Sequence, residues 1–266
     1  MKIGVVGDHM QDVWYVADRY CANSEGPAPT YKIAHTHRMA GGAGNVAANL
    51  ESLGANVDWM YFGETFGPIK NRLIYNNQIV SRWDVNDRCM EYATGLEHGW
   101  KQINQPYDAL VISDYLKGSI TEEWIHRELV KVDCPIFVDT KRDPRSYNGF
   151  ATALFPNNSE YLKYKREYDT MKLVVHTRGQ DGLELLKYGE PRYAVKGFDV
   201  DEVCVVGAGD SVVAAFVWKY MQCRCEKKAA RYANAAGAVA VSKAFTSTVT
   251  VGEIESLIAM QGDKIL

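Results

Sequence analysis

Val205-Val206-Gly207-Ala208-Gly209-Asp210 is the most informative stretch of this sequence, and an apolar segment follows it from Val212 to Val217. The glycines allow a strand to turn sharply into a helix. The first N–H groups of that helix have no partner within it, and the helix dipole makes this end electropositive, so it can hold an anion. A carboxylate beside a bound phosphate is suited to phosphoryl transfer to a hydroxyl group. The segment alone fits equally well a Gly-rich turn capped by Asp210 before a core helix.

Around this stretch the chain alternates short apolar runs with helical patterns, which predicts an α/β fold with a mostly parallel sheet. The expected strands are Ile3–Val6, Val57–Phe62, Ala109–Ile112, Ile136–Val138 and Leu173–His176. The expected helices are Ala43–Leu53, Glu122–Val130, Asp210–Met221, Glu226–Lys243 and Gly252–Met260. Ligands of such sheets bind beyond the carboxyl ends of the strands.

Two segments do not follow the alternation. Residues from Asp12 to about Met39 are rich in aromatics and show no helix pattern, and Leu73–Trp83 alternates like an exposed strand. No linker composition separates these segments from the rest of the chain. We therefore expect one domain over residues 1–266 with a small β-flap built from the inserts 12–39 and 73–83.

The composition is that of a globular protein with a sizeable core, since 47% of the 266 residues are apolar and 24% are charged. The formal net charge of −3 argues against broad binding to nucleic acid or to anionic membrane. No apolar run approaches the ~20 residues that span a bilayer, and no signal peptide is visible. The six cysteines form no C-x-x-C pair, so we expect reduced thiols in a cytoplasmic protein. His35 and His37 lack a third ligand, which favours a solvent-facing strand over a metal site.

Polar residues follow one predicted strand after another. They are Asp8, Ser113–Gly118, Asp139–Lys141, Asn157–Glu160 and Thr177-Arg178. Each group alone is ordinary loop chemistry, but together with the helix start at Gly207 they predict one binding edge. Asn157 and Glu160 suit a hydrated Mg²⁺, which prefers few carboxylates, several waters and phosphate oxygens. The glycines of Gly41-Gly42-Ala43-Gly44-Asn45 permit close approach of a ligand, although this motif alone is a weak signal.

In order and approximate spacing, these residues resemble the ribokinase-like, or PfkB-type, carbohydrate kinases along the whole chain. Within that family the sequence is most similar to the bacterial D-glycero-β-D-manno-heptose 7-phosphate kinases, the kinase half of a bifunctional kinase and adenylyltransferase. The matching segments are Val6-Gly7-Asp8 with Asp12, Gly41–Ala47, Ser52–Ala55, Asn77-Gln78 with Arg82, Ser113–Tyr115 with Lys117-Gly118, Asp139 with Lys141, Pro156-Asn157 with Ser159-Glu160, Thr177-Arg178 with Gly182, Gly207–Asp210, Tyr232–Ala236 and Thr246–Val249. The resemblance implies a three-layer α/β/α fold whose β-flap acts as a lid.

The resemblance also implies ATP and Mg²⁺ as cofactors and gives each matching residue a role. Asp210 is implied as the catalytic base, and the amides of Gly207, Ala208 and Gly209 as the anion hole for the transferred phosphoryl group. The implied sugar-binding residues are Asp8, Asp12, Gly41, Gly42 and Asn45, with Arg72 and Lys117 as candidates for a phosphate on the substrate. Asn157 and Glu160 are implied on the Mg²⁺ side, and Thr177, Arg178, Gly182 and Asn234 in the nucleotide site.

The sequence departs from the family at two sites and in length. Cys204-Val205-Val206 stands where relatives have Asp-[Thr/Val]-Thr, whose Asp helps to hold a monovalent cation, and a thiol is a poor ligand for a hard cation. Phe245 stands where the family has Gly. Compared with the family, we expect helix-sized pieces to be absent between Phe62 and Arg72 and between Glu160 and Leu173.

We therefore expect ATP-dependent phosphorylation of a sugar hydroxyl, on a sugar that already carries a phosphate, such as heptose 7-phosphate. The expected partner is a small-molecule sugar, with no nucleic acid or membrane, and the resemblance implies a homodimer formed through the lid. Two alternatives stay open. One is a nucleoside or adenosine-type kinase, and the other is a non-catalytic relative that binds a sugar or nucleotide.

Overall fold

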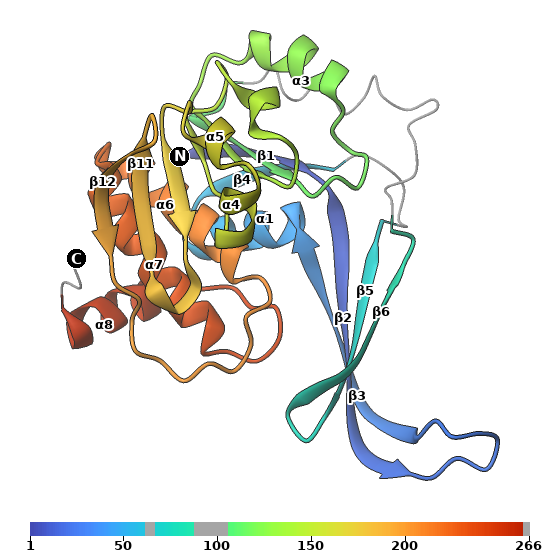
Figure 1. The fold of residues 1–266 in the computed structure, drawn as a ribbon. Helices are drawn as coiled ribbons and strands as arrows, with labels where there is room; N and C mark the ends of the chain where they lie inside the picture. The colour runs from blue at the N-terminus through green and yellow to red at the C-terminus, as the bar shows by residue number, and fades with distance from the viewer. Residues whose placement is uncertain (62–66, 88–105, 263–266) are drawn as a thin grey trace.

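An eight-stranded sheet forms the body of the molecule in the computed structural model, which describes residues 1–61, 67–87 and 106–262 (Figure 1). Its strands stand in the order β12-β11-β10-β9-β8-β7-β1-β4. Their bounds are β1 Lys2–Gly7, β4 Asn56–Tyr61, β7 Ala109–Asp114, β8 Ile136–Thr140, β9 Ala153–Leu154, β10 Val174–Thr177, β11 Leu183–Lys187 and β12 Glu190–Val195. All pairs from β4 to β10 are parallel, and β11 is antiparallel to both neighbours. The expected mostly parallel sheet is confirmed.

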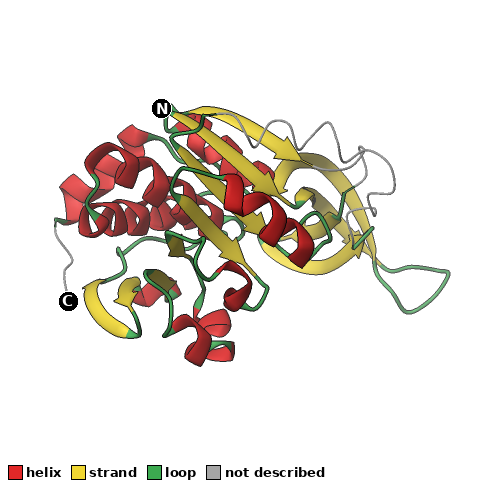
Figure 2. Cartoon of the chain, turned by 90° about the horizontal axis from the view of Figure 1, so that it is seen from above, coloured by secondary structure: helices red, strands yellow, loops and turns green. Residues whose placement is uncertain are grey.

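Helices cover both faces of this sheet and complete three layers (Figure 2). One face carries α1 (Ala43–Ser52), α6 (Ala208–Cys223), α7 (Glu226–Val241) and α8 (Val251–Gln261). The other carries α3 (Glu122–Glu128), α4 (Asn158–Lys163) and α5 (Lys165–Tyr168). Short 3₁₀ turns are η1 (Leu129–Lys131), η2 (Pro144–Tyr147) and η3 (Gly179–Asp181). Since successive side chains of a strand point to opposite faces, Ile3 and Val5 of β1 pack in the first core and Val6 in the second.

The five expected strands and five expected helices are present, with ends that differ by a few residues. Phe62, the expected end of β4, lies outside the described residues. The strand expected before Asn157 is the two-residue β9, but the sequence did not predict the hairpin β11–β12, which turns at Tyr188 and Gly189 with φ of 49° and 76°. It also missed the short helices α4 and α5, which lie in the region where a helix-sized piece was expected to be absent.

A second sheet of four strands, the lid, projects away from the body in the order β3-β2-β5-β6 (Figure 1). Its strands are β2 (His9–Cys21), β3 (Thr30–Gly42), β5 (Ile69–Tyr75) and β6 (Gln78–Val85). The two expected inserts lie within it. The prediction that Leu73–Trp83 is a single exposed strand was wrong, because this segment turns back on itself at Asn76 and Asn77, with φ of 51° and 61°. Asn tolerates these left-handed angles, which a two-residue hairpin turn requires.

Other expectations from composition concern membranes, cysteines and metals. In the three described ranges, every helix is too short or too polar to cross a bilayer. The cysteines of those ranges are all free thiols, and Cys89 lies outside them. His35 and His37 are exposed on β3, and no group of three or more ligating side chains gathers within the described residues.

Candidate active site

The start of α6 offers an uncovered backbone end beside a buried carboxylate. Gly207, which precedes the helix, has a φ of 83°, and a β-carbon there would lie 2.6 Å from Asn45 Nδ2, so a side chain does not fit. A β-carbon at Gly209 would meet nothing within 4 Å, so this side of the first turn is open. The Ala208 N–H donates to the Val205 carbonyl at 3.4 Å. The open start of a helix, whose first N–H groups lack partners within the helix, is suited to hold an anion.

Asp210 lies in that first turn and is only 4% exposed. Its Oδ2 accepts a hydrogen bond from Asn45 Nδ2 at 2.8 Å, and its Oδ1 accepts one from the Tyr115 hydroxyl at 2.9 Å. Burial raises the pKa of Asp210 to about 6, although both hydrogen bonds act in the opposite direction. A carboxyl group with this pKa is mostly ionised at neutral pH and is a stronger base than an exposed aspartate.

A chain of buried amides holds α1 against α6 at this point. Asn49 Nδ2 donates to the Asn45 carbonyl at 2.9 Å and to Asn45 Oδ1 at 3.1 Å. The Ser211 hydroxyl and the Val249 N–H both donate to Asn49 Oδ1, each at 3.1 Å. Because its Oδ1 accepts from Asn49, the Asn45 amide is oriented with its N–H₂ group toward Asp210.

A buried ion pair joins two strands of the lid beside the same site. Arg72 Nη1 of β5 lies 2.7 Å from Asp12 Oδ1 of β2, and both side chains are almost fully buried. Asp12 Oδ2 accepts a hydrogen bond from the Thr246 hydroxyl at 2.9 Å, and a β-carbon on Gly41 would lie 3.0 Å from that oxygen. The guanidinium of Arg72 lies 4.6 Å from the ring centroid of Trp14. Asp12 and Arg72, expected to contact the sugar and its phosphate separately, are thus bound to each other.

Asp8 organises the loop that follows β7. Its carboxylate is fully buried and accepts hydrogen bonds from the N–H groups of Tyr115, Lys117 and Ser119 at 2.7, 3.0 and 3.0 Å. Its carbonyl accepts from Ala43 N at 3.2 Å, at the start of α1. These bonds give Asp8 a structural role that the sequence did not indicate, and its contact with a sugar stays a prediction.

Two further residues expected to bind substrate lie nearby. Gly42 is the N-cap of α1 with a φ of 56°, and a β-carbon there would lie 2.7 Å from the Asp8 carbonyl oxygen. The ammonium of Lys117 forms an ion pair with Asp87, just beyond the end of β6. Lys117 therefore ties the loop after β7 to the lid.

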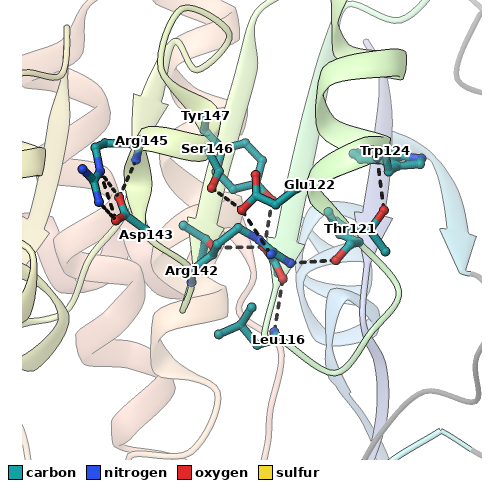
Figure 3. A network of polar contacts seen from close by, with 12 residues as sticks. Leu116, Thr121, Glu122, Trp124, Arg142, Asp143, Arg145, Ser146 and Tyr147 are labelled. Carbon is teal, nitrogen blue, oxygen red and sulfur yellow. Dashed lines mark hydrogen bonds and ion pairs between the residues drawn. The ribbon is translucent and has the colours of Figure 1, made fainter.

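A polar network behind that loop supports it from the side of α3 and η2 (Figure 3). Arg142 Nε donates to Asp114 Oδ2 at 2.8 Å, and its Nη2 donates to the Ile120 carbonyl at 2.7 Å. The Tyr147 hydroxyl donates to the same Asp114 oxygen at 2.9 Å, and the Leu116 N–H donates to Asp114 Oδ1 at 3.1 Å. The buried charge of Asp114 is thereby compensated, and the backbone on either side of Tyr115 is fixed.

Asn157 and Glu160 form the capping box of α4. Asn157 Oδ1 accepts from the Glu160 N–H at 3.0 Å, Glu160 Oε2 accepts from the Asn157 N–H at 3.0 Å, and Asn157 Nδ2 donates to Glu160 Oε1 at 2.7 Å. The ammonium of Lys141 also pairs with Glu160. One carboxylate and one amide oxygen fit a Mg²⁺ that keeps most of its waters and binds phosphate, which is how Mg²⁺ usually binds in nucleotide sites.

Asp139 lies at the carboxyl end of β8, next to Lys141. Burial raises the pKa of Asp139 to about 7; Lys141 lowers it, while Asp210 and Glu160 raise it further. For Lys141, burial lowers the pKa, but Asp139 and Glu160 outweigh that effect and raise it. Lys141 therefore stays charged at neutral pH. Its charge interacts both with Glu160, an expected Mg²⁺ ligand, and with Asp210, the expected base.

The residues expected to line a nucleotide site fall into two groups. Thr177, at the end of β10, pairs with Asn157 through a parallel bridge and so adjoins the capping box. Arg178 Nη1 lies 3.8 Å from Glu184 Oε2 of β11. Gly182 has a φ of 93°, and Asn234 of α7 donates from Nδ2 to the Lys196 carbonyl at 2.8 Å, beside the end of β12. These contacts bring Asn234 to the loop after β12.

Sequence reasoning gave no role to several residues of this site. Tyr115, Asn49 and Thr246 bond directly to predicted residues, and Lys70 of β5 lies over the Tyr115 ring. Tyr115 and Thr246 stood inside quoted motifs, so motif membership was a usable signal for them. Asn49 follows Asn45 by one helical turn, which places both on one face of α1. For Lys70 the only signal was its alternation with Arg72 along β5, which places both side chains on one face of the strand.

The sequence is similar to that of known carbohydrate kinases. Residues 103–251 match the model of the pfkB family of carbohydrate kinases. The chain is 29% identical over 300 residues to the bifunctional protein HldE of Nitratiruptor sp., covering 96% of this chain and 64% of that protein. It thus spans less than two thirds of the length of this relative.

Solved structures with low sequence identity share the fold. One is phosphofructokinase-2 from Escherichia coli in complex with substrates and products, with a TM-score of 0.77, 16% identity, and 98% of each chain covered. Another is Arabidopsis thaliana ribokinase complexed with ribose and ATP, with a TM-score of 0.74, 16% identity, and 96% and 98% covered. The fold of this chain is that of the ribokinase-like kinases, as the sequence motifs implied.

Proposed function

Because the chain belongs to the pfkB family of carbohydrate kinases, we propose that it transfers the γ-phosphoryl group of ATP to a hydroxyl of a sugar that already carries a phosphate, such as heptose 7-phosphate. The observation that carries this proposal is Asp210. It is a buried carboxylate at an open helix start, held by Asn45 and Tyr115, with a pKa raised to about 6. The family gives the reaction class, and the phosphorylated acceptor is our inference from the charges around this carboxylate.

The steps assigned to the chain are positioning and proton transfer. Asp210 accepts the proton of the attacking hydroxyl as its oxygen bonds to the γ-phosphorus, and the bond from phosphorus to the ADP oxygen breaks. The backbone N–H groups at Gly207, Ala208 and Gly209 stabilise the negative charge on the transferred group. Bound Mg²⁺ supplies further charge neutralisation at the phosphate oxygens, and Asn157 and Glu160 are the residues that would hold it. Thr177, Arg178, Gly182 and Asn234 remain the proposed nucleotide contacts.

Cations on one face of the lid support an acceptor with its own phosphate. Lys70 and Arg72 alternate along β5, and Arg82 of β6 stands directly opposite Arg72 in the sheet register. Arg72 pairs with Asp12 and Arg82 with Asp84, whereas no ion pair is found for Lys70 within the described residues. Burial lowers the pKa of Lys70; Asp12 raises it, and the two arginines lower it. An anionic group of the substrate would give the ammonium of Lys70 an ion-pair partner.

A direct test measures ATP consumption by the purified protein with phosphorylated heptoses, phosphorylated hexoses and nucleosides as acceptors. We expect turnover with a phosphorylated sugar, and Asp210→Asn should lower kcat by at least ~10²-fold with little change in nucleotide affinity. Asp201→Asn, a change of an exposed aspartate, is the control. Faster turnover of nucleosides would identify the nucleoside kinase alternative. ATP or sugar binding without any turnover would identify a non-catalytic relative.

We also propose that the chain forms a homodimer lid to lid. The lid is a small sheet, and its exposed large hydrophobic residues include Tyr20, Ile33, Ile79 and Trp83. A small sheet with open edges is marginally stable alone and favours pairing with a second copy around a two-fold axis. Light scattering at micromolar concentration tests this, and a clean monomer of about the chain mass of 29.8 kDa would contradict it.

A further inference from the structure

Tyr115 has contacts on three sides that neither the motif nor the proposed reaction assigns to it. Its hydroxyl donates to Asp210 Oδ1 at 2.9 Å, on the oxygen that Asn45 does not use. The two oxygens of Asp210 are therefore each held by one donor. A carboxylate fixed through both oxygens cannot rotate freely about its side-chain bond, so the direction in which it accepts a proton is set.

Two lysines rest on the ring of the same tyrosine. Lys70 Nζ, from β5 of the lid, lies 5.1 Å from the ring centroid, and Lys141 Nζ, from the loop after β8, lies 5.0 Å from it. Lys141 pairs in addition with Glu160. In the described part of the chain no ion pair is found for Lys70. The Tyr115 ring is therefore the contact that its ammonium makes there. An ammonium within ~6 Å of an aromatic ring is attracted to the negative ring face.

Hydrogen bonds to two carboxylates fix the backbone at Tyr115 and at the residue after it. The Tyr115 N–H donates to Asp8 Oδ2 at 2.7 Å, and the next residue, Leu116, donates to Asp114 Oδ1 at 3.1 Å with a φ of 58°. Both carboxylates are buried. A left-handed bulky residue that the surrounding hydrogen bonds hold in place is found mostly where function requires the geometry.

We propose that Tyr115 is a positioning residue for the phosphoryl transfer: its hydroxyl holds Asp210 in the ionised, correctly oriented form, and its ring is the surface on which the lid lysine Lys70 rests. This inference depends on the proposed function for its kinetic consequences, but the orientation and ionisation of Asp210 can be measured without any substrate.

The electrostatics support this role. Burial raises the pKa of Tyr115 well above 10, so its hydroxyl remains a donor at any working pH and does not compete with Asp210 as base. The hydrogen bond from Tyr115 lowers the pKa of Asp210, opposing burial. The other charged or titratable groups that face Asp210 are Asp12 of β2, Lys70 of β5, Asp139 of β8 and Lys141 after β8. Removing the hydroxyl alone should therefore raise the pKa of Asp210.

The decisive variant is Tyr115→Phe, which keeps the ring and removes the hydroxyl. The matched control is Tyr107→Phe, because the Tyr107 hydroxyl also donates to a carboxylate, Asp58 Oδ2 at 3.1 Å, and contacts neither Asp210 nor the loop of Tyr115. We expect the acid limb of the kcat/KM profile to move up by about one pH unit in Tyr115→Phe and to stay in place in Tyr107→Phe. Turnover well above neutral pH should change little.

A substrate-free measurement separates this inference from the proposed function. The carboxyl carbon of Asp210, followed by ¹³C NMR through a pH titration and assigned with Asp210→Asn, should titrate at higher pH in Tyr115→Phe and at an unchanged pH in Tyr107→Phe. Incorporation of 3-fluorotyrosine at position 115, a near-isosteric and stronger donor, should shift the titration to lower pH even if Tyr115→Phe does not fold. An unmoved Asp210 titration in the folded Tyr115→Phe protein or in the fluorinated protein would overturn the proposal, whether or not the wild-type protein turns over sugar.

Discussion

Asn45 Nδ2 lies 2.8 Å from Asp210 Oδ2, so the first turn of α1 holds the first turn of α6 across 165 residues of sequence. The bond lowers the pKa of Asp210 against the effect of burial. The Asn45 amide also fills the space beside Gly207, where a β-carbon would lie 2.6 Å from the same nitrogen. The base and the proposed anion hole are therefore positioned by one amide side chain.

Replacement of Asn45 by Asp should disable the base near neutral pH. A second carboxylate in place of the amide donor removes a hydrogen bond and adds a like charge, and both changes raise the pKa of Asp210. We expect kcat/KM near pH 7 to fall at least ~10-fold and to recover partly at higher pH. Asn148→Asp, which adds the same charge at an exposed position, should leave the pH profile unchanged. A pH-independent loss of activity would contradict this reading.

Activity should rise with pH through about 6, the raised pKa of Asp210, because only the ionised carboxylate can accept the proton. Asp139, with a pKa of about 7, titrates in the same range. Asp139→Asn distinguishes the two groups, since the acid limb should persist in that variant if Asp210 is the base. The measurement is kcat/KM across the pH range in buffers of constant ionic strength. Loss of the acid limb in Asp139→Asn would assign the titration to Asp139.

Lys70→Met should weaken binding of the acceptor's phosphate. The lysine lies on the lid face that carries Arg72 and over the ring of Tyr115, which bonds to Asp210. We expect the KM for a phosphorylated sugar to rise about 10-fold, in line with loss of a charge-assisted contact, and the KM for ATP to change little. Lys32→Met, on an exposed part of β3, is the matched control. Equal effects on both substrates would place Lys70 on the nucleotide side.

Arg72→Met should destabilise the protein by about 3 kcal/mol, because it leaves the buried carboxylate of Asp12 without its ion-pair partner. The double variant Asp12→Asn/Arg72→Met should recover much of the loss, since no buried charge remains. Arg82→Met is the control: its pair with Asp84 leaves the arginine side chain 52% exposed and should contribute less than about 1 kcal/mol. Unfolding in urea measures all three, and a double variant no more stable than Arg72→Met would count against the argument.

Activity should be nearly indifferent to K⁺ or Na⁺, because Cys204 and Val206 replace the residues that relatives use near a monovalent cation. The Cys204 N–H donates to the Val241 carbonyl at 3.0 Å, so this segment is held against the end of α7. Rates in the two chloride salts at fixed ionic strength test the point. A strong K⁺ requirement would show that other groups form a cation site, and Cys204→Asp should introduce K⁺ dependence only if they do not.

The candidate site was predicted in part. Gly207–Asp210 and the polar residues at the strand ends were identified because turn chemistry and strand periodicity are local properties of the chain. For Asn157 and Glu160 the sequence suggested metal ligands, which stays a prediction; it did not predict the capping box that these residues form, although the N-x-x-E spacing was visible. The lid hairpin was missed although Asn76 and Asn77 gave a local turn signal between the two apolar runs.

The sequence by itself determined the five parallel strands and five helices that were expected in the body, and that a carboxylate follows the Gly-rich start of α6. Only the tertiary structure decided that Tyr115 and Asn45 each donate to one oxygen of Asp210 and that Arg72 forms an ion pair with Asp12. The physical reason is the range of the interactions. Periodicity, turns and caps depend on neighbours a few residues apart, whereas these contacts depend on the order of strands in the sheet and on how α1, α6 and the lid pack across it.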